Sequence, residues 1–69
     1  MNEYYYIKPI LKEGEHAIIG HYETLEKAME AAKSFLNECN ESNLSAITEI
    51  RFYHTKITEL DIIIKPKKQ

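Results

Sequence analysis

One amphipathic segment constrains this chain more than any other feature. Between residues 25 and 39, seven apolar side chains recur at helical spacing and share one face of a helix. They are Leu25, Ala28, Met29, Ala32, Phe35, Leu36 and Cys39. At the helical repeat they span roughly 120°, the width expected of a helix that lies on a core and keeps its other side in water. The pattern predicts one helix over residues 25–39 that covers one face of a neighbouring layer.

Thr24 marks the predicted start of this helix. Its hydroxyl can accept a hydrogen bond from a free N–H of the first turn, and Glu26 lies where the helix dipole favours an acid. The polar run of residues 40–43 predicts the end of the helix. Asn40 and Asn43 in this run suit the left-handed backbone of a helix end.

Segments rich in aromatic and β-branched residues flank the helix and predict four strands. The strands cover residues 3–11, 16–22, 46–54 and 60–64. Pro9 lacks an N–H, so the later part of the first strand is expected to be an edge, a bulge or the strand end. Residues 44–49 mix helix and strand preferences, so their assignment stays open between the two.

The order strand, strand, helix, strand, strand defines an α+β fold of two layers. A right-handed crossover of the helix over the first strand gives an antiparallel four-stranded sheet with the spatial order 2-1-3-4. A chain of 69 residues has room for one domain, which we assign to residues 1–64, followed by a basic tail of residues 65–69.

Strand alternation divides the side chains between the two faces of this sheet. The face under the helix is expected to carry Tyr5, Ile7, Ile18, Ile50, Phe52, Leu60, Ile62 and Ile64. The opposite face is expected to carry Tyr4, Tyr6, His21, Glu49, Arg51, Tyr53 and Ile63. One helix covers only one face, and a chain this short buries only about 60% of the surface that its unfolded form exposes. We therefore expect a second copy or another partner on the face without the helix.

The sequence carries no catalytic or metal-binding pattern. His16 and His21 are five positions apart, so on one strand they point to opposite faces, and the favoured strand order keeps His54 away from His21. Cys39 is the one cysteine, which excludes an internal disulfide, and the end of a helix is where the dipole disfavours a thiolate. We expect no catalytic residue, no metal and no cofactor.

The charge distribution separates the body of the chain from its end. The net charge is -2, but residues 1–64 carry six basic and eleven acidic side chains, which makes -5 before the lysine-rich tail. A nucleic-acid-binding domain needs a basic patch or stripe, and this body has none. No apolar run approaches the roughly 20 residues of a membrane span, and no N-terminal export signal is present. These features predict a cytoplasmic protein.

Tyr4, Tyr6, Arg51 and Tyr53 are the candidate partner-binding residues. Tyrosine and arginine are enriched at binding hot spots because they bury a large area and keep a polar end. The simpler interpretation is that tyrosines suit strands and stack with their cross-strand neighbours on a wet face. We expect a protein-binding module that forms a homodimer through this face. The alternative is a nucleic-acid-binding accessory protein that uses the same face and the lysine tail.

The junction between the second strand and the helix resembles that of other small domains. The stretch Ile19-Gly20-His21-Tyr22-Glu23-Thr24-Leu25-Glu26-Lys27-Ala28, with Ala31-Ala32-Lys33 after it, is similar to the arm-type DNA-binding domains of phage integrases and to AP2-like plant domains. Those domains end with their helix and have basic sheet residues, so DNA binding is not transferred to any residue here. In size and layout the chain also resembles compact accessory proteins of phages and mobile elements, some of which inhibit host enzymes by covering a surface.

Overall fold

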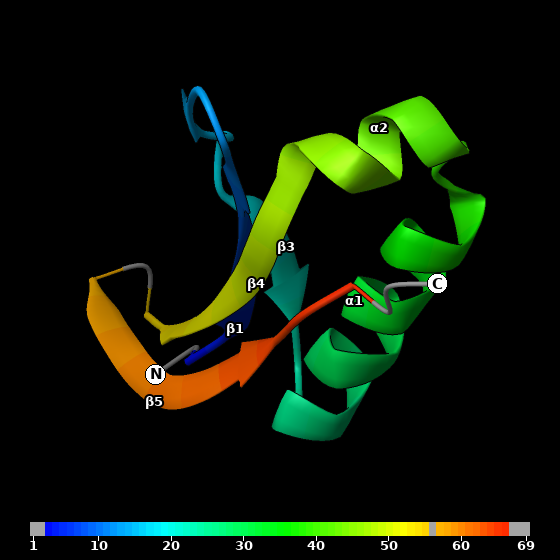
Figure 1. The fold of residues 1–69 in the computed structure, drawn as a ribbon. Coiled ribbons are helices and arrows are strands. Elements are labelled where there is room, and N and C mark those ends of the chain that lie inside the picture. Colours follow the sequence, from blue (N-terminus) through cyan, green and yellow to red (C-terminus); the bar gives the residue numbers. More distant parts are fainter. Residues whose placement is uncertain (1–2, 56, 67–69) are drawn as a thin grey trace.

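A computed structural model describes residues 3–55 and 57–66 and shows a sheet with both helices on one side (Figure 1). The strands are β1 (Tyr5–Leu11), β2 (Gly14–Glu15), β3 (Ile19–Tyr22), β4 (Ile47–His54) and β5 (Thr58–Ile64). The helices α1 (Leu25–Glu38) and α2 (Glu41–Ala46) connect β3 to β4. All strand pairs are antiparallel, which confirms the predicted two-layer α+β fold. Residues 67–69 of the predicted tail lie outside the described residues.

β1 is the central strand of the sheet. On one side it pairs with β4 along its whole length, from Tyr5 opposite His54 to Leu11 opposite Ile47. On its other side it pairs with β2 and β3, while β5 pairs with β4 at the far edge. This is the predicted order 2-1-3-4, with one difference: the predicted second strand of residues 16–22 is a strand only over β3, and β2 is an extra short strand before it.

Pro9 explains the gap between β2 and β3. The later part of β1 was expected to be an edge, a bulge or the strand end, and the β1–β4 register does shift there, between Ile10 and Leu11. Pro9 itself is buried inside the sheet, opposite Ile50. Its carbonyl accepts a hydrogen bond from the N–H of His16 at 3.0 Å, so its own amide position faces the same side. Because proline has no N–H to donate there, the ladder to the neighbouring strand is interrupted, and residues 16–18 lie outside any strand.

Two polar caps define the helices. The hydroxyl of Thr24 accepts a hydrogen bond from the N–H of Lys27 at 3.1 Å, which confirms the predicted start of α1. α1 ends at Glu38, which confirms the predicted end of the helix, but the left-handed backbone predicted for Asn40 and Asn43 is wrong. Asn40 has an extended backbone, and its side chain accepts a hydrogen bond from the N–H of Asn43 at 2.8 Å. Asparagine is also a preferred N-cap, and here it begins the unexpected helix α2.

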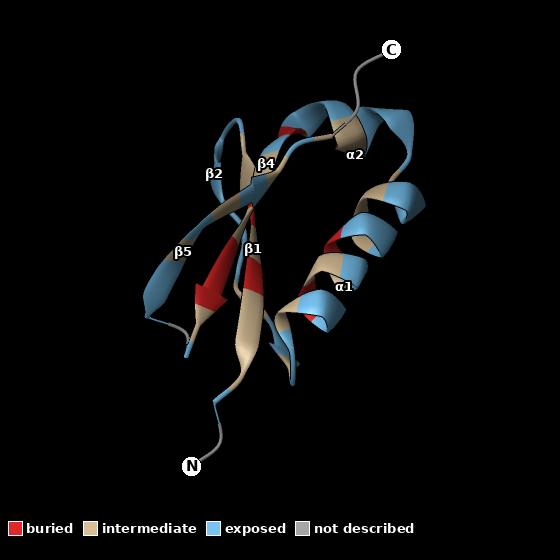
Figure 2. Cartoon of the chain, turned by 90° about the horizontal axis from the view of Figure 1, so that it is seen from below, coloured by how far each residue is buried: buried red, intermediate tan, exposed pale blue. Residues whose placement is uncertain are grey.

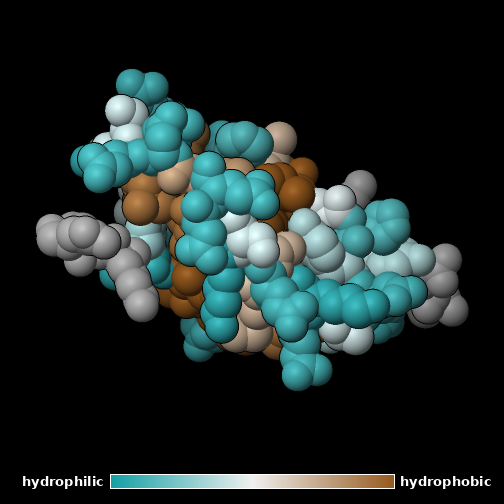
Figure 3. Space-filling view, turned by 90° about the vertical axis from the view of Figure 1, so that its right-hand side faces the viewer, coloured by the Kyte–Doolittle hydropathy of each residue, from teal (hydrophilic) through white to brown (hydrophobic). Residues whose placement is uncertain are grey.

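The core lies between α1 and the strands β1 and β4 (Figure 2). Its buried members are Ile7, Ala28, Ala32, Ile50 and Phe52. Partly buried side chains pack around them: Tyr5, Ile19, Tyr22, Leu25, Met29, Ala31, Phe35, Leu36, Leu60, Ile62 and Ile64. The prediction of Ile18 in this group is wrong; since Ile18 precedes β3, its neighbour Ile19 takes the place opposite Ile7. Seen from the helix side, the surface carries hydrophilic residues with hydrophobic areas between them (Figure 3).

The two buried alanines let α1 approach the sheet closely, which predicts a steric effect. Ala32→Leu is expected to lower the free energy of unfolding by about 1–3 kcal/mol, because it adds volume where the packing is complete. The control Ser34→Leu places the same side chain on the exposed side of α1 and is expected to change stability by less than about 0.5 kcal/mol. Urea unfolding followed by circular dichroism measures both variants. Equal effects would contradict the close packing at Ala32.

Candidate protein-binding surface

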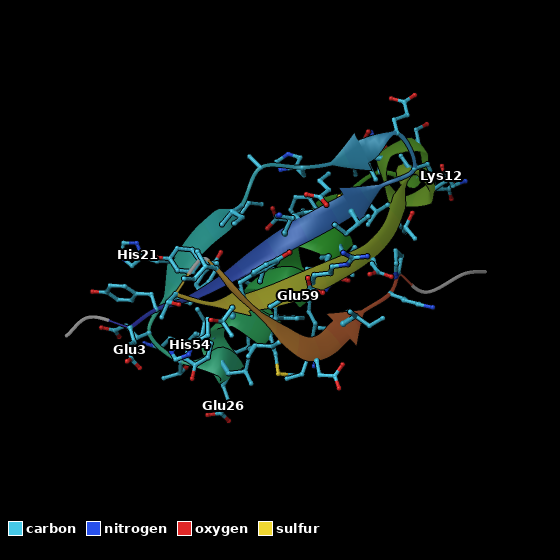
Figure 4. All side chains as sticks on the ribbon, turned by 90° about the vertical axis from the view of Figure 1, so that its left-hand side faces the viewer. Glu3, Lys12, His21, Glu26, His54 and Glu59 are labelled. Atoms are coloured by element: carbon cyan, nitrogen blue, oxygen red, sulfur yellow. The ribbon has the colours of Figure 1, made fainter. Side chains whose placement is uncertain are left out.

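The sheet face opposite α1 has no helix over it (Figures 1 and 4). We call it the open face and define it by the side chains of Tyr4, Tyr6, Lys8, Glu49, Arg51, Tyr53, Glu59 and Ile63. The strand register brings them together: Tyr6 lies opposite Tyr53, Lys8 opposite Arg51, and Glu59 of β5 opposite Tyr53. Directly opposed residues in a sheet point to the same face. Glu59 lies near the middle of this face in Figure 4.

Tyr53 occupies the centre of the open face and is nevertheless only 9% exposed. The Nζ of Lys8 lies 4.9 Å from the centroid of its ring, a cation–π geometry. Its hydroxyl donates a hydrogen bond to Glu59 Oε1 at 3.3 Å. The ring is thus covered by charged side chains of the same chain and not by a helix.

Each cation of the open face is bound to carboxylates of the chain. Arg51 Nε donates to Glu49 Oε2 at 2.6 Å and lies 4.0 Å from Glu59 Oε2, while Lys8 Nζ donates to Glu15 Oε1 at 3.1 Å. The hydrogen bond to Glu49 raises the pKa of Arg51 above its ordinary value, and the hydrogen bond to Glu15 does the same for the pKa of Lys8. Both groups therefore stay charged at physiological pH. The open face presents paired charges of both signs.

An aromatic cluster forms the end of the open face beside β3. The rings of Tyr4 and His21 are 4.2 Å apart between centroids, and those of Tyr6 and His21 are 6.5 Å apart. The ring of Tyr6 lies against Gly20, so closely that a Cβ atom added at Gly20 would overlap Tyr6 Cδ2. A shallow depression of about 170 Å³ is lined by Tyr6, Ile18, Gly20 and His21.

The other histidines lie apart from this cluster. His54 stacks on Tyr5 of the helix-side face, with centroids 4.6 Å apart, and its Nε2 lies 3.3 Å from Glu3 Oε1. His16 makes an edge contact with the ring of Phe35 at 6.5 Å. Within residues 3–55 and 57–66, no group of three or more His, Cys, Asp or Glu side chains is arranged to hold a metal ion.

The four predicted binding residues share the open face but have different surroundings. Tyr6 and Tyr53 are direct cross-strand neighbours, and Arg51 is two positions from Tyr53 on β4. Tyr4 lies at the end of the face, where its ring packs on His21 and its carbonyl accepts from the N–H of Thr55 at 2.9 Å.

Two charged members of the open face, Lys8 and Glu59, were not identified from the sequence, and neither was Glu15, which binds Lys8. Lys8 alternates in step with Tyr4 and Tyr6, so the strand pattern alone could have found it. Glu59 was missed because the last strand was predicted to begin at residue 60 and begins at residue 58. Glu15 reaches Lys8 only because β2 pairs with the end of β1, and the sequence has no signal for that contact.

No protein-family model matches this chain, and comparison with curated proteins and with solved structures found no similar protein. Neither α1 nor α2 is long and apolar enough to cross a membrane. The residues of the open face are therefore the main basis for a function.

The contact between Tyr6 and Gly20 predicts coupling between these two positions. Gly20→Ala is expected to lower the free energy of unfolding by about 1–3 kcal/mol, because the new Cβ atom would overlap the tyrosine ring. In a Tyr6→Ala background, the same change is expected to cost less than about 0.5 kcal/mol. A double-mutant cycle from urea unfolding gives the coupling. The same cost in both backgrounds would show that the ring of Tyr6 does not lie on Gly20.

Proposed function

We propose that this chain is a small non-catalytic module that binds protein through its open face. The observation that carries the proposal is the placement of Tyr6, Arg51 and Tyr53 on two paired strands, on a face without a helix. Tyrosine and arginine are the residue types that most often anchor a protein contact. The cluster of Tyr4 and His21 extends the same surface toward β3.

The charges on the open face support a contact that forms and dissociates over a permanent one. Permanent homodimer interfaces are apolar at their centre and depleted in charge. Here Lys8, Arg51, Glu49 and Glu59 surround Tyr53, and burying paired ions carries a large desolvation cost. We therefore propose a partner with a polar surface of mixed charge. The homodimer expected from the sequence is better accommodated at a sheet edge than on this face.

The same charges support protein binding over nucleic-acid binding. Lys8 and Arg51 are each paired with a carboxylate, and the net charge of residues 1–64 is negative, so the face offers no free cation stripe to a phosphate backbone. A cytoplasmic location belongs to the proposal, because Cys39 is a free cysteine and fits a reducing compartment. The role as an accessory protein or inhibitor of a phage or mobile element rests on analogy of size and layout.

Photo-crosslinking in cells of the natural host tests the proposed function. A photoreactive benzoylphenylalanine in place of Tyr4 projects from the open face, whereas the same residue in place of Glu30 projects from the exposed side of α1. We expect a discrete protein adduct from position 4 and none from position 30. Arg51→Glu is expected to weaken this adduct about tenfold, as for a hot-spot arginine, while Lys33→Glu makes the same charge change on α1 and leaves the adduct unchanged.

Two results would contradict protein binding by the open face. Adducts that appear only from position 30 would move the contact to the helix layer. Adducts that are removed by nuclease, and whose yield falls steeply as salt rises, would support the nucleic-acid alternative.

A further inference from the structure

The outer side of β5 is a free sheet edge. β5 pairs with β4, and within residues 3–55 and 57–66 no strand pairs with its other side (Figures 1 and 2). The strand has seven residues, with no glycine or proline among them. An edge of this kind presents unpaired N–H and C=O groups to another strand.

The hydrogen bonds of the sheet show which residues of β5 point outward. Thr55 donates its N–H to the carbonyl of Tyr4, so the backbone groups of Thr55 face β1. Alternate residues of a strand point their N–H and C=O groups to the same side. The backbone groups of Tyr53 and Arg51 therefore also face β1. Ile63 lies opposite Arg51 and therefore points its N–H and C=O away from β4. By alternation, the residues two positions before and after Ile63 point the same way.

We propose that this edge binds β5 of a second copy, antiparallel, about a two-fold axis that passes through Ile63. In this register Ile63 lies opposite itself, and Asp61 lies opposite Lys65 of the second copy on both sides of the axis. Ile63 is 46% exposed in the single chain, and the contact covers it. Opposite charges directly across a strand pair stabilise it, as do paired β-branched side chains. On the helix side, Ile62 meets Ile64 of the second copy, which extends the apolar side of both sheets.

Neighbouring registers fit less well. Centring the axis on Asp61 places two carboxylates opposite each other, which is unfavourable. Centring it on Ile62 places the charged Asp61 opposite the apolar Ile63 and puts the axis within residues 60–62, where the β4–β5 register shifts. In the register centred on Ile63, the axis lies beyond that shift.

The opposite edge of the sheet is unsuited to the same contact. β2 has two residues and β3 has four, and the interruption at residues 16–18 separates them. One usable edge gives a closed dimer with two-fold symmetry and not an open filament. Five residue pairs make a small contact, so we expect a dimer that depends on concentration. This inference does not depend on the proposed function, because Ile63 is the member of the open face that the dimer covers, and Tyr4, Tyr6 and Arg51 stay outside the contact.

A charge exchange tests the pairing. Sedimentation equilibrium from about 10 μM to about 1 mM, the range of weak contacts, is expected to show dimers of the natural chain. Lys65→Glu and Asp61→Lys each place like charges across the axis and are expected to weaken the dimer about tenfold or more. The double variant Asp61→Lys with Lys65→Glu restores the attraction and the dimer. Lys33→Glu on α1 is the matched control and leaves association unchanged.

A disulfide tests the register. In a Cys39→Ser background, Ile63→Cys is expected to form a crosslinked dimer on mild oxidation, because a directly hydrogen-bonded pair has its Cα atoms about 5.5 Å apart, within disulfide range. Glu30→Cys on the exposed side of α1, in the same background, is expected to stay monomeric under the same conditions.

Several outcomes would overturn the edge dimer. These are a monomer throughout the concentration range, equal effects of Lys65→Glu and Lys33→Glu, a charge exchange that does not restore association, or a crosslink from residue 30 and none from residue 63. Association that is lost in Arg51→Glu and kept in Lys65→Glu would place the second copy on the open face, which overturns this inference. Conversely, an intact edge dimer without an adduct from position 4 would remove only the proposed function.

Discussion

The close packing of α1 on the sheet is the contact on which the other features depend. Ala28 and Ala32 are fully buried where α1 meets the sheet, and their small side chains bring the helix near Ile7, Ile50 and Phe52. The one long helix of a 69-residue chain is used for this contact, and the short α2 lies on the same side (Figure 1). The side chains that alternate with these core residues on the same strands point to the open face and therefore have no helix to pack against.

The open face meets this requirement with charged side chains. Lys8 and Glu59 cover the ring of Tyr53, and Glu49 binds Arg51, so this central ring is removed from water by side chains of the same chain. Ile63, on the edge strand, stays 46% exposed. The polar centre suits reversible binding of another protein, and the apolar edge suits a second copy. Separate regions of the sheet can thus support two different contacts.

Much of the fold could be predicted from spacing and alternation. The helical stripe gave α1, the Thr24 cap marked its start, and strand parity placed Phe52 under the helix and Arg51 opposite it. The rest depends on tertiary pairing. Ile18 was assigned to the core because simple alternation does not reveal that residues 16–18 lie outside any strand and that the β1–β3 register shifts, which places Ile19 opposite Ile7. α2 was missed because a helix-ending asparagine and a helix-starting asparagine look alike in sequence. The ion pairs of Glu15 and Glu59 could not be predicted without knowing which strand residues lie opposite each other.

The most direct test of the account measures solvent access to the two sheet faces in a dilute sample. Methyl and side-chain N–H signals are recorded by NMR with a soluble gadolinium chelate, which broadens groups that water can reach. We predict strong broadening for Ile63 and for the Nε–H of Arg51, and little for the methyl groups of Ile7 and Ile50, because α1 covers only their face. Equal protection of Ile63, Arg51, Ile7 and Ile50 would contradict a sheet with one covered face.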